Sequence, residues 1–160
     1  MTIVYAARHC DYSNPEGVMP FRMPGFPLTG LGRRQVQRLA AYLADRNMAA
    51  VYSSPQLRTR QTAEIVAERC GLGMMMSDLI NEMENPGLQG RPLSEYKGSP
   101  FIALSHDSET PGQIFDRMYR FVLEVLHKHD GNVVFVSHGD PIGILREGLL
   151  GNDLEPWKTR

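Results

Sequence analysis

The chain has 160 residues, of which 42% are hydrophobic and 22% charged, and its formal net charge is −1. This length and composition are typical of one globular domain with a real core, and the near-zero charge argues against nucleic acid or a membrane surface as a partner. Cys10 and Cys70 make no disulfide framework, and neither a membrane-spanning run nor a signal peptide is recognisable. We therefore expect one cytoplasmic domain over residues 1–160.

Two apolar runs of the sequence each end in a histidine. Residues 2–10 read TIVYAARHC, and residues 132–140 read NVVFVSHGD. Such runs are typical of strands buried on both faces of a parallel sheet, and α/β proteins bind ligands at the carboxyl ends of these strands. We expect the two strands to lie side by side, so that His9 and His138 line one pocket with Arg8 beside them.

A proline-rich loop follows the first strand. Residues 10–28 contain four prolines, which rule out a central strand, and they interleave these with aromatic residues and Arg22. We expect this segment to form one wall of the pocket, with Arg22 as a candidate contact for an anion. A helix is then predicted from Thr29, its cap, to about Arg46, because apolar residues recur at helical spacing. Residues 49–52 predict a short strand.

Capping signals place a second arginine at the same pocket. Ser54 is predicted to cap a helix and Pro55 to be its first residue. Arg58 then falls in the first turn, where free backbone N–H groups also favour an anion. Gly71 can end this helix. Arg58 is therefore a candidate phosphate ligand.

The middle of the chain supplies a candidate acid. The three methionines at 74–76 predict a strand or core filler, and residues 79–82 resemble a short strand that ends in the carboxylate of Glu82. Residues 83–110 are irregular and rich in glycine, proline and serine. We expect them to form the second wall of the pocket.

The last third of the sequence alternates helix, strand and helix. Thr110 and Gln113 form a capping box around Pro111, which opens a long helix with one apolar stripe. After the second histidine-bearing strand, Asp140 and Pro141 are predicted to start the final helix. Strands that alternate with helices predict an α/β fold, a three-layer α/β/α sandwich with a mostly parallel central sheet.

The candidate side chains fit one chemistry, which is phosphoryl transfer. Arg8 and Arg58 can grip a phosphate bidentately. One neutral imidazole can attack phosphorus while the other donates a hydrogen bond to the transferring group. The carboxyl group of Glu82 can protonate the leaving oxygen. Phosphoryl transfer mainly requires positioning and charge neutralisation, and these five side chains supply both.

These residues lie in motifs that resemble those of the histidine phosphatase superfamily, the phosphoglycerate mutase-like family. Five or more motifs occur in the family's order over nearly the whole chain. They are RHC at 8–10 for the family's Arg-His-Gly, PLT at 27–29 with Gly32 and Gln35, SSPQLRTRQTA at 53–63, residues 81–90 around Glu82, Glu109-Thr110 with Arg117, and VSHG at 136–139.

The resemblance implies a phosphoglycerate mutase-like fold and a phosphohistidine intermediate on His9. It places Arg8, Arg58 and His138 around the phosphate and makes Glu82 the proton donor, with no metal or cofactor required. Asn14 lies one position early for the family's phosphate-contacting asparagine and is kept as a candidate contact together with Arg22.

The sequence also departs from the family's pattern. Cys10 replaces the usual glycine, and a thiol beside Arg8 is expected to have some thiolate character. Tyr12 stands where threonine is common, and an aspartate often found before Pro-Leu-Thr is absent. The chain ends soon after the last predicted helix, where many members continue, which fits a minimal member or a truncated chain.

Three other functions are alternatives to a histidine-dependent phosphatase. A cysteine phosphatase would need arginine six positions after Cys10, where the chain has Glu16. A metallohydrolase could use the His-x-Asp pairs at 9–11 and 138–140, but the two arginines would repel the cation. A catalytically weak phosphate- or phosphoprotein-binding relative stays open.

The expected activity is hydrolysis of phosphomonoesters, on small phosphorylated metabolites or phosphoprotein. The alternative is a phosphotransferase of the phosphoglycerate mutase type, which must keep water away from its phosphohistidine. The short segment between Glu82 and Glu109 favours an open pocket, in which water accepts the phosphoryl group.

Overall fold

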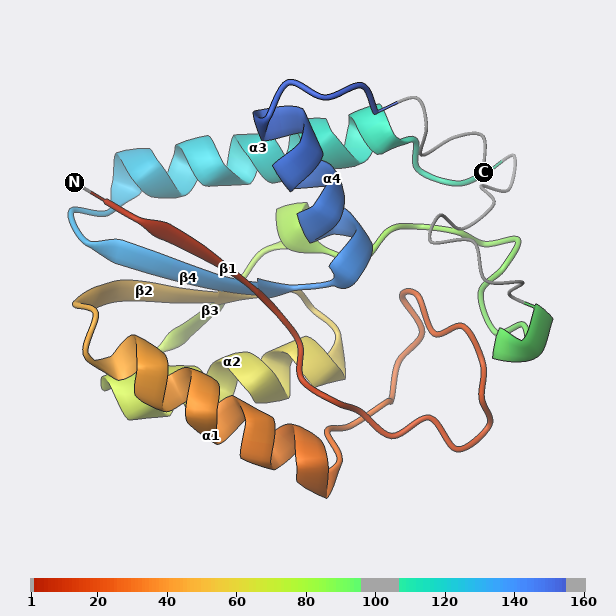
Figure 1. The fold of residues 1–160 in the computed structure, drawn as a ribbon, viewed down its shortest axis with the longest axis horizontal. Coiled ribbons are helices and arrows are strands. Elements are labelled where there is room, and N and C mark those ends of the chain that lie inside the picture. The colour runs from red at the N-terminus through yellow and green to blue at the C-terminus, as the bar shows by residue number, and fades with distance from the viewer. Residues whose placement is uncertain (1, 96–106, 155–160) are drawn as a thin grey trace.

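A computed structural model describes residues 2–95 and 107–154 (Figure 1). Four parallel strands form one sheet in the order β1-β4-β2-β3. Helices α1 and α2 cover one face of this sheet, and α3 and α4 cover the other (Figure 1). The elements are β1 Val4–Arg8, α1 Gly30–Ala44, β2 Met48–Ser53, α2 Leu57–Cys70, β3 Met74–Met76, α3 Pro111–Lys128, β4 Asn132–Ser137 and α4 Gly139–Leu149.

This architecture confirms the predicted three-layer α/β/α sandwich with a parallel sheet. Strands and helices alternate along the chain, which is the pattern that builds such a sheet. Among the described residues, no helix has both the length and the apolar character that crossing a bilayer would require.

The two histidine-bearing strands are neighbours in the sheet, as predicted. β1 and β4 pair in parallel, with Arg8 opposite Ser137. The backbone N–H of His9 donates to the carbonyl of Ser137 at 3.0 Å, which extends the pairing by one residue. Both strands therefore end at the same side of the sheet, which brings His9 and His138 to one place.

The core has two layers, one on each face of the sheet. Along β4, Val133 and Phe135 pack with the residues of α3 and α4, whereas Val134 and Val136 pack with those of α1 and α2. All four side chains are at most 1% exposed. A strand covered on both faces needs apolar residues at every position, which explains the continuous run in the sequence.

Two helix starts differ from the prediction. α2 begins at Leu57 rather than at Pro55, and its N-cap residue Gln56 makes no side-chain capping bond. Ser54, the predicted cap, instead donates its hydroxyl hydrogen to Gln56 Oε1. The N-cap of α4 is His138 rather than Asp140, which lies inside the first turn.

The predicted strand at 79–82 is wrong. Asp78–Ile80 forms a 3₁₀ helix, η1, capped by Ser77, whose hydroxyl accepts from the N–H of Leu79. The N–H of Asn81 closes this turn on the carbonyl of Asp78 at 3.1 Å. Local hydrogen bonds from a short polar side chain have outcompeted strand pairing here. Glu82 consequently lies in irregular chain beyond the sheet.

The two predicted pocket walls contact each other. Val18 bridges Pro92 in antiparallel fashion, and the N–H groups of Met19 and Leu93 donate to the carbonyls of Arg91 (2.8 Å) and Gly17 (2.7 Å). Of the second wall, residues 83–110, the part at 96–106 lies outside the described residues. A second 3₁₀ turn, η2, spans Leu93–Glu95.

We expect Gly32→Ala to destabilise the protein, because α1 touches the loop after β1 at this glycine. A Cβ at Gly32 would lie 2.0 Å from the carbonyl oxygen of Asp11, a backbone atom that cannot swing aside. Overpacking of this kind costs about 1–3 kcal/mol, which should appear as a lower urea midpoint. Gly30→Ala is the matched control, since its Cβ would meet only the mobile Arg34 side chain at 3.8 Å. Equal stability of the two variants would contradict this packing.

Candidate active site

His9 is held as a neutral imidazole with one ring nitrogen free. Its side chain follows β1 and is buried. Nδ1 lies 2.9 Å from the carbonyl of Cys10, and because a carbonyl only accepts, Nδ1 carries the proton and Nε2 the lone pair. Burial lowers the pKa of His9 to about 4, and the charges of Arg58 and Arg8 act in the same direction. The imidazole of His9 is therefore neutral at neutral pH, the form that can act as a nucleophile.

His138 lies next to His9 and is fully buried. The two ring centroids are 5.3 Å apart at an angle of 61°. Nε2 of His138 is 2.7 Å from Ser54 Oγ. Because Ser54 gives its own hydrogen to Gln56, it accepts from His138, so the Nε2 of His138 is protonated. Nδ1 is left as an acceptor facing Arg58.

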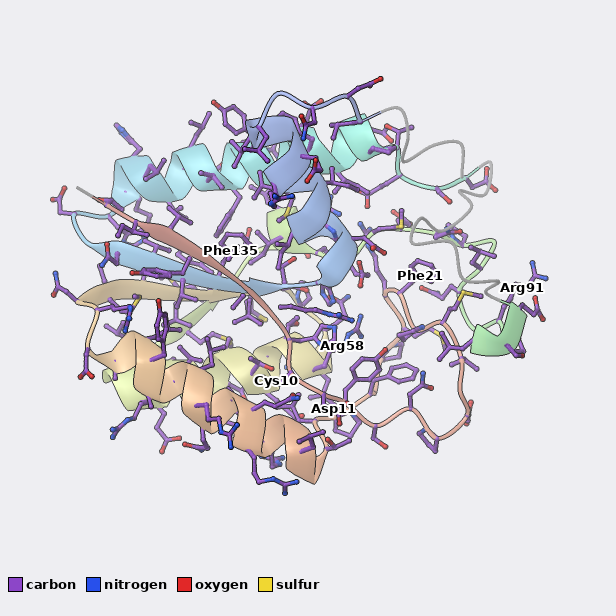
Figure 2. The ribbon with its side chains drawn as sticks, viewed as in Figure 1. Cys10, Asp11, Phe21, Arg58, Arg91 and Phe135 are labelled. Carbon is purple, nitrogen blue, oxygen red and sulfur yellow. The ribbon has the colours of Figure 1, made fainter. Side chains whose placement is uncertain are left out.

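Arg58 is a buried cation with unused donors. Its side chain is 1% exposed, and Nη2 donates to the carbonyl of Phe21 at 2.9 Å and to His138 Nδ1 at 3.2 Å. Nε and Nη1 are buried without a hydrogen-bond partner. Leaving charged donors unpaired is costly, so this arrangement is suited to an incoming anion. In Figure 2, Arg58 lies beyond the strand ends, on the same side as Cys10 and Asp11.

Arg8 adds a second cation at the exit of β1. A Cβ built on Gly139 would lie 3.6 Å from its guanidinium carbon, so the side chain rests beside the start of α4. Arg8 makes no ion pair within the described part of the chain, and it lines a cavity of about 260 Å³. The cavity is lined by Arg8, His9, Cys10, Asp11, Tyr12 and Gln35.

Glu82 completes the cluster, and its surroundings favour the protonated form. Its Oε2 lies 3.2 Å from Nδ1 of His138 and 3.7 Å from Nη2 of Arg58. Burial, aided by the negative charge of Asp140, raises the pKa of Glu82 to about 7. The hydrogen bond from the N–H of Met83 and the nearby arginines lower it less. A carboxyl group that keeps its proton near neutral pH is suited to general acid catalysis.

The structure gives the two remaining candidates other partners. Nδ2 of Asn14 donates to the carbonyl of Val18 at 2.7 Å, and its Oδ1 accepts from the N–H of the same residue, which closes a local turn. Each guanidinium nitrogen of Arg22 already has an acceptor in Glu82, Glu84 or Glu109. The predicted phosphate contacts of Asn14 and Arg22 therefore find no support, since nearby protein acceptors occupy their donors.

The expected thiolate character of Cys10 is wrong. Burial raises the pKa of the Cys10 thiol and outweighs the hydrogen bond with Thr62, which lowers it. The backbone of Cys10 matters more, because its carbonyl orients His9. Its N–H donates to Thr62 Oγ1 at 3.2 Å, which ties this segment to α2.

Sequence reasoning missed several contributors to the site. The ring of Tyr12 meets that of His9 edge to face with centroids 5.1 Å apart, and the guanidinium of Arg58 lies 5.4 Å from the Tyr12 centroid. The sequence predicts only a capping role for Ser54, whereas its hydroxyl lies 2.7 Å from Nε2 of His138 and orients that ring. Its place directly after a buried strand was the signal that could have revealed this role.

Metal ligands are not gathered at this site. In residues 2–95 and 107–154, no three His, Cys, Asp or Glu side chains form a group that could hold a metal ion. The candidate site instead combines two neutral imidazoles, two cations and one protonated carboxyl group. This combination can bind a phosphate and transfer its phosphoryl group.

Comparison with known proteins leads to the same chemistry. The sequence matches the profile of the histidine phosphatase superfamily (branch 1) over residues 4–160. The chain belongs to this superfamily. The uncharacterised protein Rv0525 of Mycobacterium tuberculosis (strain ATCC 25618 / H37Rv) is 40% identical over 164 residues, which cover 96% of this chain and 81% of the relative.

One further relative is similar in sequence, and one solved structure is similar in fold. The uncharacterised phosphatase PhoE of Bacillus subtilis (strain 168) is 28% identical over 84% of this chain and 70% of its own length. The mycobacterial glucosyl-3-phosphoglycerate phosphatase Rv2419c superposes with a TM-score of 0.81 at 24% identity, covering 95% of this chain and 81% of that one. This likeness shows the phosphoglycerate mutase-like fold.

The shifted pKa values predict a bell-shaped pH profile of kcat/KM on an alkyl phosphate. Below about 4, His9 gains a proton and loses its nucleophilic lone pair. Above about 7, Glu82 loses the proton that the leaving oxygen needs. Each limb should fall about tenfold per pH unit, after correction for ionisation of the substrate. Activity that keeps rising through pH 7 would contradict the assignment of Glu82.

Proposed function

We propose that the protein is a phosphomonoester hydrolase that works through a phosphohistidine intermediate on His9. The observation that carries this proposal is the buried Arg58, whose Nε and Nη1 have no partner, beside a neutral imidazole. Free donors for a phosphate and a free lone pair for phosphorus thus lie in one place. The proposed substrates are small phosphorylated metabolites or phosphoprotein.

In the first step, Arg58 and Arg8 hold the phosphoryl oxygens while Nε2 of His9 attacks phosphorus. The bond between phosphorus and the alcohol oxygen breaks, and the proton of Glu82 passes to that oxygen. In the second step, water attacks the phosphohistidine. Glu82, now a carboxylate, takes a proton from the water, and free phosphate leaves with His9 restored.

His138 stabilises the transferring group in this scheme. Burial and the charge of Arg58 hold the pKa of His138 well below its usual value in the free protein. Bound phosphate is negative and acts in the opposite direction, favouring a proton on Nδ1. From that atom His138 would donate to the phosphoryl oxygens as their charge increases.

Hydrolysis rather than intermolecular transfer is favoured by the wall next to Glu82. Two hydrogen bonds join Glu84 to Glu109. The backbone N–H of Glu109 donates to the carbonyl of Glu84 at 3.0 Å, and the side-chain Oε2 of Glu109 accepts from the backbone N–H of Glu84. The intervening segment therefore leaves and returns at one point. From the small number of residues between these two points, we infer that water can reach the intermediate.

We expect a labelled phosphomonoester to leave its phosphoryl group on His9. Quenching in alkali should trap an acid-labile phosphoramidate, and phosphate should be released with chelator present. His9→Ala should abolish both signals. Label that persists in this variant would contradict the assignment of the nucleophile.

Two further results of the same assays would overturn the hydrolase. Efficient interconversion of 2- and 3-phosphoglycerate with little free phosphate would identify a mutase. Tight phosphate binding with no turnover of any ester in a metabolite and phosphopeptide screen would identify a binding protein.

Glu82→Gln should lower kcat/KM, which reports the first step, by about 10²- to 10⁴-fold for alkyl phosphates, the usual size of a general acid effect. p-Nitrophenol leaves without a proton, so its phosphate ester should be affected much less. Glu95→Gln, which removes an exposed carboxylate of the same wall, is the control and should leave both substrates unchanged. Equal losses with both esters in Glu82→Gln would show that another group is the acid.

A further inference from the structure

Glu82 is placed by side chains rather than by regular secondary structure. The two histidines follow strands β1 and β4, and Arg58 lies on α2, whereas Glu82 lies beyond the 3₁₀ turn Asp78–Ile80 in irregular chain. A general acid must nevertheless stay within reach of the leaving oxygen. Something outside its own segment must therefore fix its position.

Two arginines from distant segments hold the backbone around Glu82. The Nε of Arg22 donates to the Glu82 carbonyl at 2.7 Å, and Nη2 of Arg117 approaches the same oxygen at 3.4 Å. Nη1 of Arg117 donates to the carbonyls of Leu79 and Asn81, each at 2.9 Å. The acid-bearing segment thus has three carbonyls that accept from guanidinium groups.

Glu109 joins both arginines to this segment. Its Oε2 accepts from Arg22 Nη2 at 2.7 Å, from Arg117 Nη2 at 3.1 Å and from the N–H of Glu84 at 2.9 Å. Its Oε1 accepts from Arg117 Nε at 2.8 Å. Burial alone would raise the pKa of Glu109, but the hydrogen bond and charge of Arg117, with the charge of Arg22, hold it below its ordinary value.

The arginines fix the backbone of Glu82 without pairing with its carboxyl group. Oε2 of Glu82 instead faces His138 at 3.2 Å. The charge of Arg117 has only a small lowering effect on the pKa of Glu82, which burial keeps raised. The arginines therefore act directly on the position of the acid, and on its pKa mainly through the burial that this position gives.

The same arrangement links the acid to the phosphate site through Phe21 and Arg22. The carbonyl of Phe21 accepts from Arg58 Nη2, and the next residue, Arg22, holds Glu82. Phe21 is buried and has a φ of +38°, a conformation that bulky residues rarely adopt. Such backbone strain persists where surrounding contacts over-determine it, often at functional sites.

We propose that Glu109, Arg22 and Arg117 are positioning residues that hold Glu82 in register with the phosphate bound at Arg58. This inference rests on the proposed function, in which Glu82 is the general acid. The three residues touch no reacting atom, so they act only through Glu82. Loosening them should impair proton donation and spare the attack of His9.

The test compares Glu109→Gln and Arg22→Gln with the control Arg120→Gln, which lies on α3, the helix that carries Arg117. Arg120 is exposed, and its ion pair with Glu124 is long, at 3.9 Å, so its loss should have little effect. With alkyl phosphates, kcat/KM of the two network variants should fall about tenfold to a hundredfold, the cost of a misplaced catalytic group. With p-nitrophenyl phosphate it should stay close to that of the wild type. Equal losses on both esters, or no loss, would overturn the proposal.

A second readout does not depend on turnover. The side-chain carboxyl carbon of Glu82, followed by ¹³C NMR, should titrate at about 7 in the wild type and nearer the ordinary value for glutamate in the network variants, because the freed segment lets water reach the carboxyl group. An unchanged titration would overturn the inference. An inactive wild type would instead overturn the proposed function, and the titration would still test the network.

Thermal unfolding separates positioning from loss of fold. Arg22 is 28% exposed and Glu109 18%, so Arg22→Gln carries the test if Glu109→Gln proves unfolded. Restoration of alkyl phosphatase activity by Arg22→Lys, which can still donate to the Glu82 carbonyl, would support positioning. Failure of Arg22→Lys to exceed Arg22→Gln would argue against it.

Discussion

The parallel pairing of β1 with β4 is the constraint on which the site depends. Arg8 lies opposite Ser137 in this register, and each strand continues into a histidine. A shift by one residue would turn the apolar side chains of a strand from one core layer to the other, so packing on both faces holds the register. The closeness of His9 and His138, whose ring centroids are 5.3 Å apart, therefore follows from how the core is filled.

Burial then shifts the pKa values of His9 and Glu82 in opposite directions. It disfavours charge in every case, which lowers the pKa of His9 and raises that of Glu82. The buried Arg58 strengthens the first shift and opposes the second, yet burial and the charge of Asp140 outweigh it at Glu82. Within one buried, cationic cluster, His9 is therefore neutral while Glu82 keeps its proton at the same pH. This is the division of roles that the proposed phosphoryl transfer with a poor leaving group needs.

The sequence was sufficient where local pattern and fold agree. The strands ending in His9 and His138, the Thr29 cap and the Thr110 capping box are all present, because periodicity and capping are local properties. It could not reveal the acidic partners of Arg22, which lie 62 and 87 residues away. It also failed at Cys10, where exposure and not the neighbouring residue type decides the pKa of the thiol. Contacts between distant segments were the missing information in both cases.

The same distinction separates two kinds of functional residue in this protein. His9 and His138 directly follow strands β1 and β4, and Arg58 lies on α2, so regular secondary structure positions all three. Glu82 is positioned by charged side chains, and its place depends on all of them at once. Since buried ion pairs need partners with matched geometry, a change in Arg22, Glu109 or Arg117 would alter the acid while the phosphate site stayed intact. Proton donation can therefore be adjusted independently of phosphate binding in this fold.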